Sequence, residues 1–561
     1  MTPITTPFIT GTEPNSAMKK QKPQDDEALL LDKLMQRFEQ SRNRRAKWEP
    51  LWQECYNFVL PQRGGFDGFD NAGRTRMETI FDATAMDAAD QLAASLLGNL
   101  TPIWSQWFGL KPGPELSAVE AEALAPVLER AAKTIQDHFD RSNFAVEIHQ
   151  CYLDLIIGGT ASLCFEESDP GSFSAFRFHA VPLADIYLEE GVSGVLDGTY
   201  RILNMTLAQL YDRYPLAVMG LPPRLIKQGE KEPQTRFKVM ESVLPDALGT
   251  FTMTAVLTET GQEPQILEQT RLPASPVINF RWLKGPGEIY GRSPIMKSLP
   301  DIKTANKVVE LILKNASIAV TGVWQADDDG VLNPANIQLQ PGSIIPKAVG
   351  SKGLQPLEMP GRFDVSELML DSLRSRIRHS LLTDRLGPVM GPRMTATEVI
   401  ERSAEMSLLL GATYGRLQSE LLTPLIKRAF AILRRRGEVP DIALDGRLVA
   451  VDYRSPLARS QGQRNVQNTL SWINSVLAMG PEAAQAVDLA RAARFLGEAL
   501  GVPSDLIRNE VDLALPPQPQ PLDSLDSLDF LTQDLSQPFP QPIVNPSSQE
   551  EISDDTTETT L

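Results

Sequence analysis

The sequence predicts an α+β protein that is mainly helical. Residues 298–320 and 364–384 repeat apolar side chains at helical spacing and flank a short stretch rich in strand and turn residues. A Gly/Pro loop follows, and then a helix of about forty residues that starts near Thr395. Residues 173–286, in contrast, alternate apolar and polar side chains in short runs that are typical of strands.

Length and composition describe a folded chain with several cores. Its 561 residues exceed what one hydrophobic core organises and suggest roughly three to four domains, and 42% of them are hydrophobic. No run of about 18 apolar residues occurs, and the N-terminus lacks the basic start and cleavage site of a signal peptide. No membrane partner is therefore expected, and secretion by the usual routes is unsupported.

Helices and strands are expected in separate parts of the first half of the chain. Helices at residues 118–141 and 145–157 precede the β-rich stretch. Within that stretch, Ser193-Gly194 and Thr260-Gly261 supply hairpin-like turns. The strands are therefore expected to pair mostly with their neighbours in sequence.

The tryptophans, cysteines and histidines are predicted to be structural. The pairs Trp48/Trp52 and Trp104/Trp107 have spacings typical of helical packing faces. Cys55, Cys151 and Cys164 lack C-x-x-C spacing and a histidine partner, which fits reduced core residues in a protein assembled in cytosol. The four histidines fall in unrelated segments, so neither a metal site nor a cofactor is expected.

The helix predicted at residues 298–320 carries a basic stripe. At about 100° per residue, its three spaced lysines fall within roughly 40° of one another and opposite the apolar face. They are Lys303, Lys307 and Lys314.

The helix predicted at residues 364–384 repeats this arrangement. Arg374, Arg378 and Arg385 have the same spacing as the lysines, whereas Arg376 points away from them. One interpretation is that both stripes are solvated faces, partly neutralised by nearby acids. These acids are Glu310, Glu367 and Asp371. The other interpretation requires a ring of copies, in which each cation becomes a ring of like charge that acts on a polyanion.

The stretch between the two helices predicts short strands joined by turns. Val323–Ala326 and Gly342–Pro346 are strand-like, and Asp327-Asp328-Asp329-Gly330 lies between them. A calcium loop needs alternating acidic ligands and a distal glutamate, and both are missing here. The aspartates therefore predict an acidic turn.

An irregular loop and a long helix follow. The two Gly-Pro pairs between Arg385 and Arg393 forbid a continuous helix, and a T-x-x-E capping box at Thr395 opens the next one. This helix should end near Gly437 and be kinked at Pro424.

The C-terminal part is predicted to be helical and then disordered. A short strand pair is expected about Asp445-Gly446, and helices at residues 466–479 and 481–500. Beyond Leu515 the chain is rich in Pro, Gln, Ser and Asp, a composition that cannot bury a core.

Four segments resemble the head-to-tail connector, or portal, proteins of short-tailed double-stranded DNA bacteriophages. They are Arg45–Pro61, Thr79–Leu110, Pro286–Ala316 and Arg393–Gly437. They occur in the family's order, and the resemblance spans roughly residues 30 to 440. It is thus a resemblance of most of the chain rather than of one motif.

The resemblance implies a portal fold assembled as a ring, dodecameric in this family. Mapped onto this sequence, the resemblance implies a flexible N-terminal arm at residues 1–25 and a wing at 26–285, followed by a first stem helix at 286–320, a β-rich clip at 321–363 and a second stem helix at 364–384. After these it implies a tunnel loop at 385–394 and a kinked spine helix of the wing at 395–437. A helical crown at 438–513 and a disordered acidic tail at 514–561 complete the implied order.

The resemblance also implies a function and partners. The ring would sit at one capsid vertex, where its channel passes double-stranded DNA during packaging and ejection, and would join head to tail. The implied channel residues are Lys303, Lys307, Lys314, Arg374 and Arg378 in the stem, with Arg385, Val389, Met390 and Arg393 in the tunnel loop. Implied partners are the large terminase subunit, capsid and scaffold proteins, tail adaptors and internal core proteins. The protein would be assembled in the host cytoplasm and reside in the virion.

A net charge of −17 is unusual for a partner of DNA, because affinity grows with each phosphate neutralised. A conduit must not bind tightly, however. An acidic body with a few basic rings would repel the duplex from the walls while keeping it centred, and phosphate contacts carry no sequence information. Weak binding to duplex of any sequence is therefore expected.

Two other classes of protein fit less well. A tail adaptor or tube protein would also form a ring, but it should lack the long helical hairpin and kinked spine. A nucleic-acid-processing enzyme would need a carboxylate cluster or a phosphate loop. The Walker-A motif fails because Met296 precedes Lys297-Ser298 where a glycine is required. An enzyme is therefore not expected.

Overall fold

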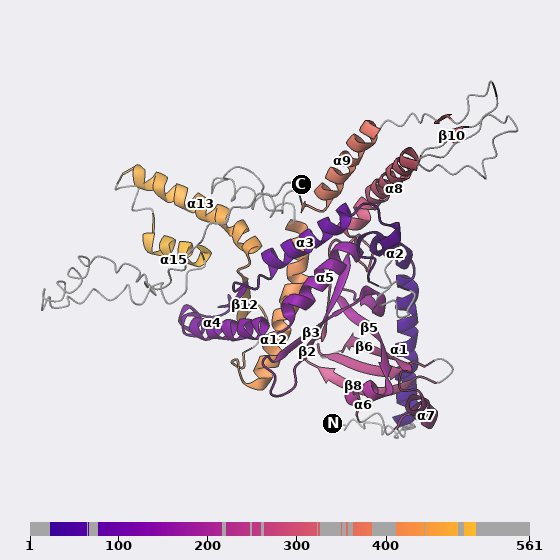
Figure 1. The fold of residues 1–561 in the computed structure, drawn as a ribbon. Coiled ribbons are helices and arrows are strands. Elements are labelled where there is room, and N and C mark those ends of the chain that lie inside the picture. Colours follow the sequence, from indigo (N-terminus) through magenta and orange to yellow (C-terminus); the bar gives the residue numbers. More distant parts are fainter. Residues whose placement is uncertain are drawn as a thin grey trace, which may run out of the picture. The chain divides into compact units, whose positions relative to one another are not determined.

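The computed structural model of the chain combines helical layers with two larger antiparallel sheets and, among the described residues, two short strand pairs (Figure 1). It describes residues 23–63, 66, 77–215, 220–246, 249–259, 263–321, 324–325, 349, 355–356, 363–383, 411–442, 444–480 and 487–500. The predicted N-terminal arm, most of the predicted clip, the tunnel loop, the start of the spine helix and the acidic tail lie outside the described residues.

Five helices and the strand β1 precede the main sheets. They are α1 (Pro23–Arg45), α2 (Glu49–Val59), α3 (Thr84–Leu100), β1 (Phe108–Pro112), α4 (Ala118–Asp140) and α5 (Phe144–Gly158). A capping box of Ser117 and Glu120 starts α4, and Gly159 ends α5 in the left-handed conformation, with φ of 75°. The two helices predicted at residues 118–141 and 145–157 are thereby confirmed.

A three-stranded antiparallel sheet lies at the centre of the fold, in the order β3-β2-β9. Its strands are β2 (Thr160–Glu167), β3 (Phe176–Val181) and β9 (Val277–Arg281). Opposite Ser162 of β2 lie Val181 on one side and Asn279 on the other, and the Ser162 hydroxyl donates to the Asn279 side chain over 2.7 Å.

A five-stranded antiparallel sheet follows in sequence order, β4-β5-β6-β7-β8. Its strands are β4 (Ile186–Glu190), β5 (Leu196–Thr206), β6 (Arg236–Pro245), β7 (Phe251–Leu257) and β8 (Gln265–Leu272). The predicted turn at Ser193-Gly194 is confirmed, with Gly194 at φ of 80°. The turn predicted at Thr260-Gly261 lies outside the described residues.

Successive side chains along these strands point to opposite faces of the five-stranded sheet, and both faces carry apolar residues. Phe237 and Val239 pack with α6 (Leu207–Arg213) and α7 (Pro223–Lys231), two helices that the sequence did not predict. Met240, on the opposite face of β6, packs instead with Leu34 and Phe38 of α1. The sheet is therefore covered on both sides.

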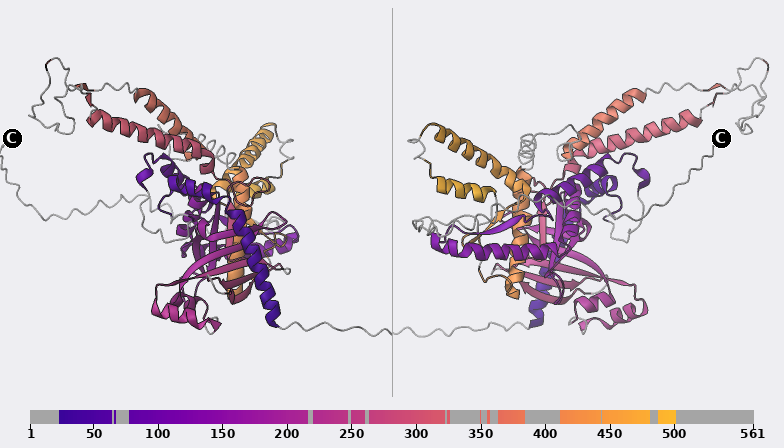
Figure 2. Two further views of the ribbon diagram at one scale, coloured as in Figure 1. Left: turned by 90° about the vertical axis from the view of Figure 1, so that its right-hand side faces the viewer. Right: turned by 60° about the vertical axis from the view of Figure 1, so that its left-hand side comes forward.

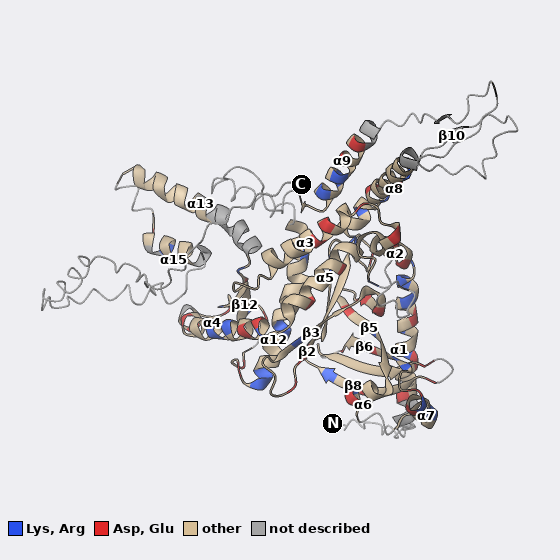
Figure 3. Cartoon of the chain, viewed as in Figure 1, with Lys and Arg blue, Asp and Glu red and all other residues tan. Residues whose placement is uncertain are grey.

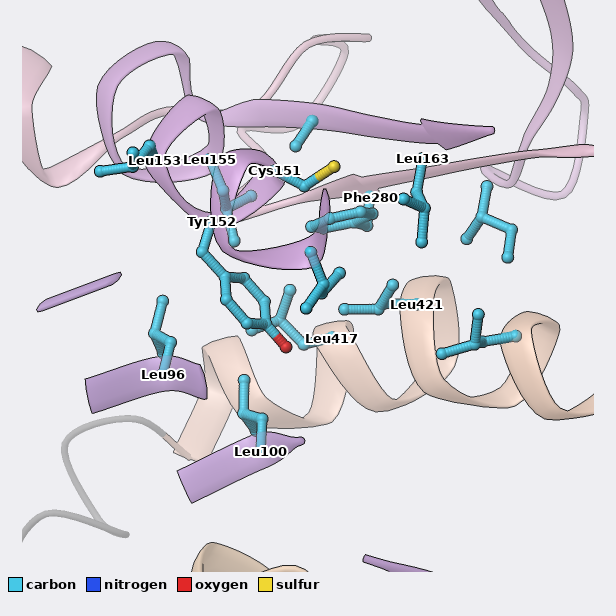
Figure 4. Packing of buried hydrophobic residues seen from close by; sticks show 14 of the residues in the cluster. Leu96, Leu100, Cys151, Tyr152, Leu153, Leu155, Leu163, Phe280, Leu417 and Leu421 are labelled. Atoms are coloured by element: carbon cyan, nitrogen blue, oxygen red, sulfur yellow. The ribbon is translucent and has the colours of Figure 1, made fainter. Parts of the chain in front are cut away.

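The largest core lies between α3, α5, the central sheet and the C-terminal spine helix. Figure 4 shows Leu96 of α3, Tyr152 of α5, Phe280 of β9 and Leu417 and Leu421 of the spine meeting there. Each is buried, and removing a leucine-sized side chain from water contributes about 1.5–3 kcal/mol. This core joins the first and last thirds of the folded chain.

Two long helices form an antiparallel hairpin. They are α8 (Pro294–Thr321) and α9 (Phe363–Ser380), which run side by side in both views of Figure 2. Short paired strands, β10 (Trp324–Gln325) and β11 (Gln355–Pro356), lie between them in sequence. The predicted end of the second helix at Asp384 is wrong, because Leu382 adopts a left-handed φ of 59° and terminates the helix earlier.

The spine helix is helical over residues 411–417 and continues through a π-helical turn, Gln418–Leu422, into α12 (Thr423–Arg436). The π turn ends two residues before Pro424, which lacks an N–H donor; the kink predicted there stays a prediction. Gly437 ends the helix as predicted, with φ of 77°.

The segment after the spine differs from its prediction. The described residues about Asp445-Gly446 do not form the predicted strand pair; instead β12 (Val449–Tyr453) pairs with β1, far away in sequence. The turn itself is real, since the Asp445 carboxylate accepts from the amides of Arg447 and Leu448. Helices α13 (Pro456–Ala478) and α15 (Leu489–Leu500) follow.

The aromatic and cysteine predictions are mostly confirmed. Trp48 and Trp52 stack with their ring centroids 5.9 Å apart, and all three cysteines are buried. Burial raises the pKa of Cys55 to about 12. The helical face predicted for Trp104 and Trp107 is wrong, because α3 ends at Leu100; Trp107 is buried beside β1, whereas Trp104 is 72% exposed.

We expect Gly159→Ala to destabilise the protein far more than Gly171→Ala. Both glycines have positive φ, which costs a non-glycine residue about 1 kcal/mol. A Cβ on Gly159 would also lie 2.3 Å from the Gly291 carbonyl oxygen, whereas one on Gly171 meets no described atom within 4 Å. The steric clash should therefore bring the loss of unfolding free energy in Gly159→Ala to about 3 kcal/mol.

Urea denaturation of the two variants measures this difference in unfolding free energy. Equal losses for both variants would contradict the close approach of Gly159 to Gly291.

Candidate nucleic-acid interface

The hairpin of α8 and α9 contains the described cations that the sequence predicts to meet DNA. The Ser293 hydroxyl accepts from the Met296 amide at the start of α8 and itself donates to the Ile157 carbonyl at the end of α5. Pro294 suits the first helical position because its missing N–H would have no partner there. The start of α8 is thereby fixed to the body of the protein.

An apolar seam holds the two helices together at their body end. The buried residues of α8 and α9 recur at spacings of three and four, as the sequence predicts. They are Leu299, Ile302 and Ala305 from α8, and Leu370, Leu373 and Ile377 from α9. Further out, Leu311 and Leu313 of α8 and Leu368 and Met369 of α9 are about half exposed or more.

A polar joint ties this hairpin to the segment before α3. The Asn306 side chain accepts from the amides of Phe81 and Asp82, over 2.6 Å and 3.2 Å, and donates to the Thr79 carbonyl over 2.9 Å. From the other helix, the Arg374 guanidinium pairs with the Asp82 carboxylate over 2.9 Å. Both helices therefore bind the same short segment.

Asp82 is the buried charged group of this joint, with a side chain 4% exposed. Burial alone would raise the pKa of Asp82, but hydrogen bonds from Thr84 and Arg374 outweigh it and hold that pKa below its ordinary value. The carboxylate is thus charged, and Arg374 neutralises it.

The predicted lysine stripe is present but largely neutralised. Lys303 pairs over 2.6 Å with Glu54 of α2, and Lys307 and Lys314 pair over 2.9 Å and 2.6 Å with Glu310. Hydrogen bonds from Lys314 and Lys307 lower the pKa of Glu310, so it stays ionised. The three lysines remain 42–64% exposed and share two carboxylates. These contacts lie within one chain, so the role of the stripe lysines in a ring of copies stays a prediction.

The arginines of α9 lie in different surroundings. Arg374 is directed to the body, with its side chain 33% exposed, whereas Arg376 pairs over 2.8 Å with Asp301 on another side of the hairpin. Arg378 is exposed near the end of α9. The structure therefore does not bring the described arginines into one continuous stripe, and their role at a channel stays a prediction.

The remaining predicted site residues lie outside the described part of the chain. These are Arg385, Val389, Met390 and Arg393 of the tunnel loop. The acidic turn of the insert lies outside it as well.

The helix that follows the predicted loop is anchored by a buried arginine. Arg281, at the end of β9, is fully buried and donates to Glu420 in the π turn over 2.7 Å and to Glu190 over 3.2 Å. It also donates to the carbonyls of Gly194 and Ile289. The spine is therefore fixed to both sheets and to the approach to α8.

Sequence reasoning missed the carboxylates and the amide that fix the hairpin. Glu54 of α2 pairs with Lys303, and Asp82 of the segment before α3 pairs with Arg374 and donates its amide to Asn306; no local motif predicts these long-range contacts. Within the described residues, no group of three or more His, Cys, Asp or Glu is placed to hold a metal ion. None of the described helices is long and apolar enough to cross a membrane.

Comparison with known proteins finds one family. A family model described as "Bacteriophage head to tail connecting protein" matches residues 31–507. The probable portal protein of Bordetella phage BPP-1 is 26% identical over 84% of this chain and 88% of its own length. The portal proteins of Salmonella phage epsilon15 and Escherichia phage T7 are 24% and 23% identical, over 85% and 72% of this chain and 88% and 75% of their own lengths.

Solved structures give a looser match. The chain titled "Neck of native GTA particle computed with C12 symmetry" aligns with a TM-score of 0.33 and 13% identity, over 75% of this chain and 92% of that chain. A likeness at this level carries no argument about assembly.

We expect Asp82→Asn to lower the free energy of unfolding by about 2 kcal/mol at pH 7, because Arg374 loses the charge of a buried partner. The matched control is Asp301→Asn, which breaks the exposed pair with Arg376 and should cost well under about 1 kcal/mol. Thermal unfolding of the three proteins measures both losses.

The effect of Asp82→Asn should depend on pH. The pKa of Asp82 is lowered in the folded state, so its stabilisation is complete above its unfolded pKa of about 3.9 and is lost as the pH falls through the folded value. The stabilities of wild type and variant should therefore begin to converge as the pH falls below about 4. A loss that is the same at pH 3 and pH 7 would contradict the ionic joint.

Proposed function

Because the chain belongs to the family of bacteriophage head-to-tail connecting proteins, we propose that copies of it form a dodecameric ring at one capsid vertex. The observation that carries this proposal is the extent of the family match, which runs from α1 through the hairpin and the spine. The chain then acts as a portal protein: double-stranded DNA enters the head through the ring during packaging and leaves through it during ejection.

The hairpin of α8 and α9 suits the wall of such a channel. Its two helices pack along an apolar seam and are tied to the body by Asn306 and Arg374, so its position is set at the base. Lys303, Lys307, Lys314 and Arg378 lie on its surface, where a ring of copies repeats each charge around the axis. The loop from Arg385 to Arg393 is proposed as the constriction that contacts DNA.

The acidic character of the chain supports passage rather than tight binding. A net charge of −17 repels phosphates, and the described stripe lysines share their charge with Glu54 and Glu310. The contacts are made with phosphates, and no base is read. DNA can move through the channel because it is never held strongly.

The proposed partners follow from this place in the virion. The clip at residues 321–363 would dock the large terminase subunit, whose ATPase supplies the energy that this chain does not generate. Capsid and scaffold proteins would surround the ring, tail adaptors would bind below it, and internal core proteins would meet the crown at 438–513. The chain itself performs no catalysis, needs no cofactor, and is assembled in the host cytoplasm.

We expect purified protein to bind duplex DNA weakly, without sequence preference and with a steep dependence on salt. Each neutralised phosphate contributes a slope of about −0.9 to the logarithm of the binding constant against the logarithm of salt concentration. Fluorescence anisotropy with two unrelated duplexes measures both properties. Tight, salt-insensitive binding to only one of them would contradict a conduit.

Shortening residues 386–392 should leave ring assembly intact while impairing DNA packaging or retention. The reason is that contacts outside the loop hold the neighbouring elements: Arg374 ties α9 to the body, and Arg281 binds Glu420 of the spine. Particle symmetry by electron microscopy and packaged DNA per capsid are the two readouts. Normal DNA yield from the shortened protein would rule out the loop as the constriction.

A further inference from the structure

An open groove lies on a side of the hairpin that neither predicted stripe occupies. It measures about 470 Å³ and runs between the first turns of α8 and the last turns of α9. Figure 3 shows the basic residues of α9 toward this end and an acidic residue nearer its start. The groove is lined by Lys297, Asp301, Ser375, Arg376, His379 and Ser380.

The groove carries an excess of positive charge. Lys297 and Arg376 face one carboxylate, that of Asp301. Each of the three stripe lysines is itself ion-paired, with Glu54 or Glu310, whereas Lys297 forms no ion pair with a described residue. A concave surface with surplus charge concentrates its field more than a convex helix face does.

Arg376 is held in place rather than neutralised outright. Asp301, whose side chain is 22% exposed, binds one edge of the guanidinium over 2.8 Å, while the Arg376 side chain remains 63% exposed. A guanidinium has five N–H donors in a fixed plane, so several stay available. The Asp301 contact thus orients the Arg376 guanidinium and leaves several of its N–H donors available.

The other lining groups are donors that suit the same ligand. Lys297 is exposed and forms no ion pair with a described residue, and the hydroxyls of Ser375 and Ser380 line the groove near Arg376. An oriented guanidinium, an ammonium and hydroxyls together match a phosphate group, with its several acceptor oxygens and single negative charge.

We propose that this groove is a phosphodiester site, through which each hairpin contacts the backbone of duplex DNA. This inference rests on the proposed function, which identifies the polymer as DNA. The principal contact with DNA phosphates is then made by Lys297 and Arg376 instead of the lysine stripe. The stripe lysines then keep a weaker, general role, because their charges are shared with carboxylates.

The test measures the salt dependence of duplex binding by the full-length protein. Lys297→Gln with Arg376→Gln should weaken binding at least tenfold at low salt. It should also reduce the slope against salt by about 2, because each lost cation removes about one phosphate contact. Arg376→Lys keeps the charge, so it should leave the slope unchanged. The matched control, Lys303→Gln with Lys307→Gln, should change the slope by less than about 1.

Three outcomes would overturn the proposal. One is an unchanged slope in the Lys297 and Arg376 variant. Another is a larger effect from the Lys303 and Lys307 variant. The last is loss of ring assembly, judged by particle mass, with DNA binding retained, since the groove would then be a contact between subunits. If the wild-type protein bound no duplex even at low salt, the proposed function itself would fail, and the variants would not be at issue.

Discussion

The buried guanidinium of Arg281 is the interaction on which the rest of the fold depends. It is fully buried and gathers Glu420 of the spine, Glu190 of β4, and the carbonyls of Gly194 and Ile289. An unpaired buried charge costs several kcal/mol, so the fold must bring these segments together at once. The central sheet, the second sheet, the spine and the chain leading into α8 thereby acquire fixed relative positions.

The position of the α8–α9 hairpin depends on the contacts of Arg281. The chain between Arg281 and α8 is short, Ser293 anchors the start of α8, and the spine begins its described course beside the same core. Asp82 and Asn306 then hold both helices where they leave the body. A channel wall needs such rigidity, because contacts with moving DNA would otherwise displace the hairpins. The same geometry leaves the groove of Lys297 and Arg376 open between them.

Local patterns predicted the elements well, but the long-range contacts had no local signal. Helical spacing located α8 and α9, and Gly437 ended the spine where expected. The turn at Asp445 was likewise recognised, yet the strand after it pairs with β1, a choice that depends on the packed core. The basic stripes were visible as spacings, whereas their carboxylate partners come from α2 and from the segment before α3. Side-chain charge could therefore be counted from the sequence, but its neutralisation could not.

In the proposed ring, copies of this chain surround an axial channel walled by the hairpin. Electron microscopy of the purified full-length protein, refined to side-chain detail around the axis, tests this arrangement. We expect a closed ring with a hole wide enough for duplex DNA and with α8 and α9 of every copy at its wall. A compact particle without an axial hole, or a ring lined by other elements, would contradict it.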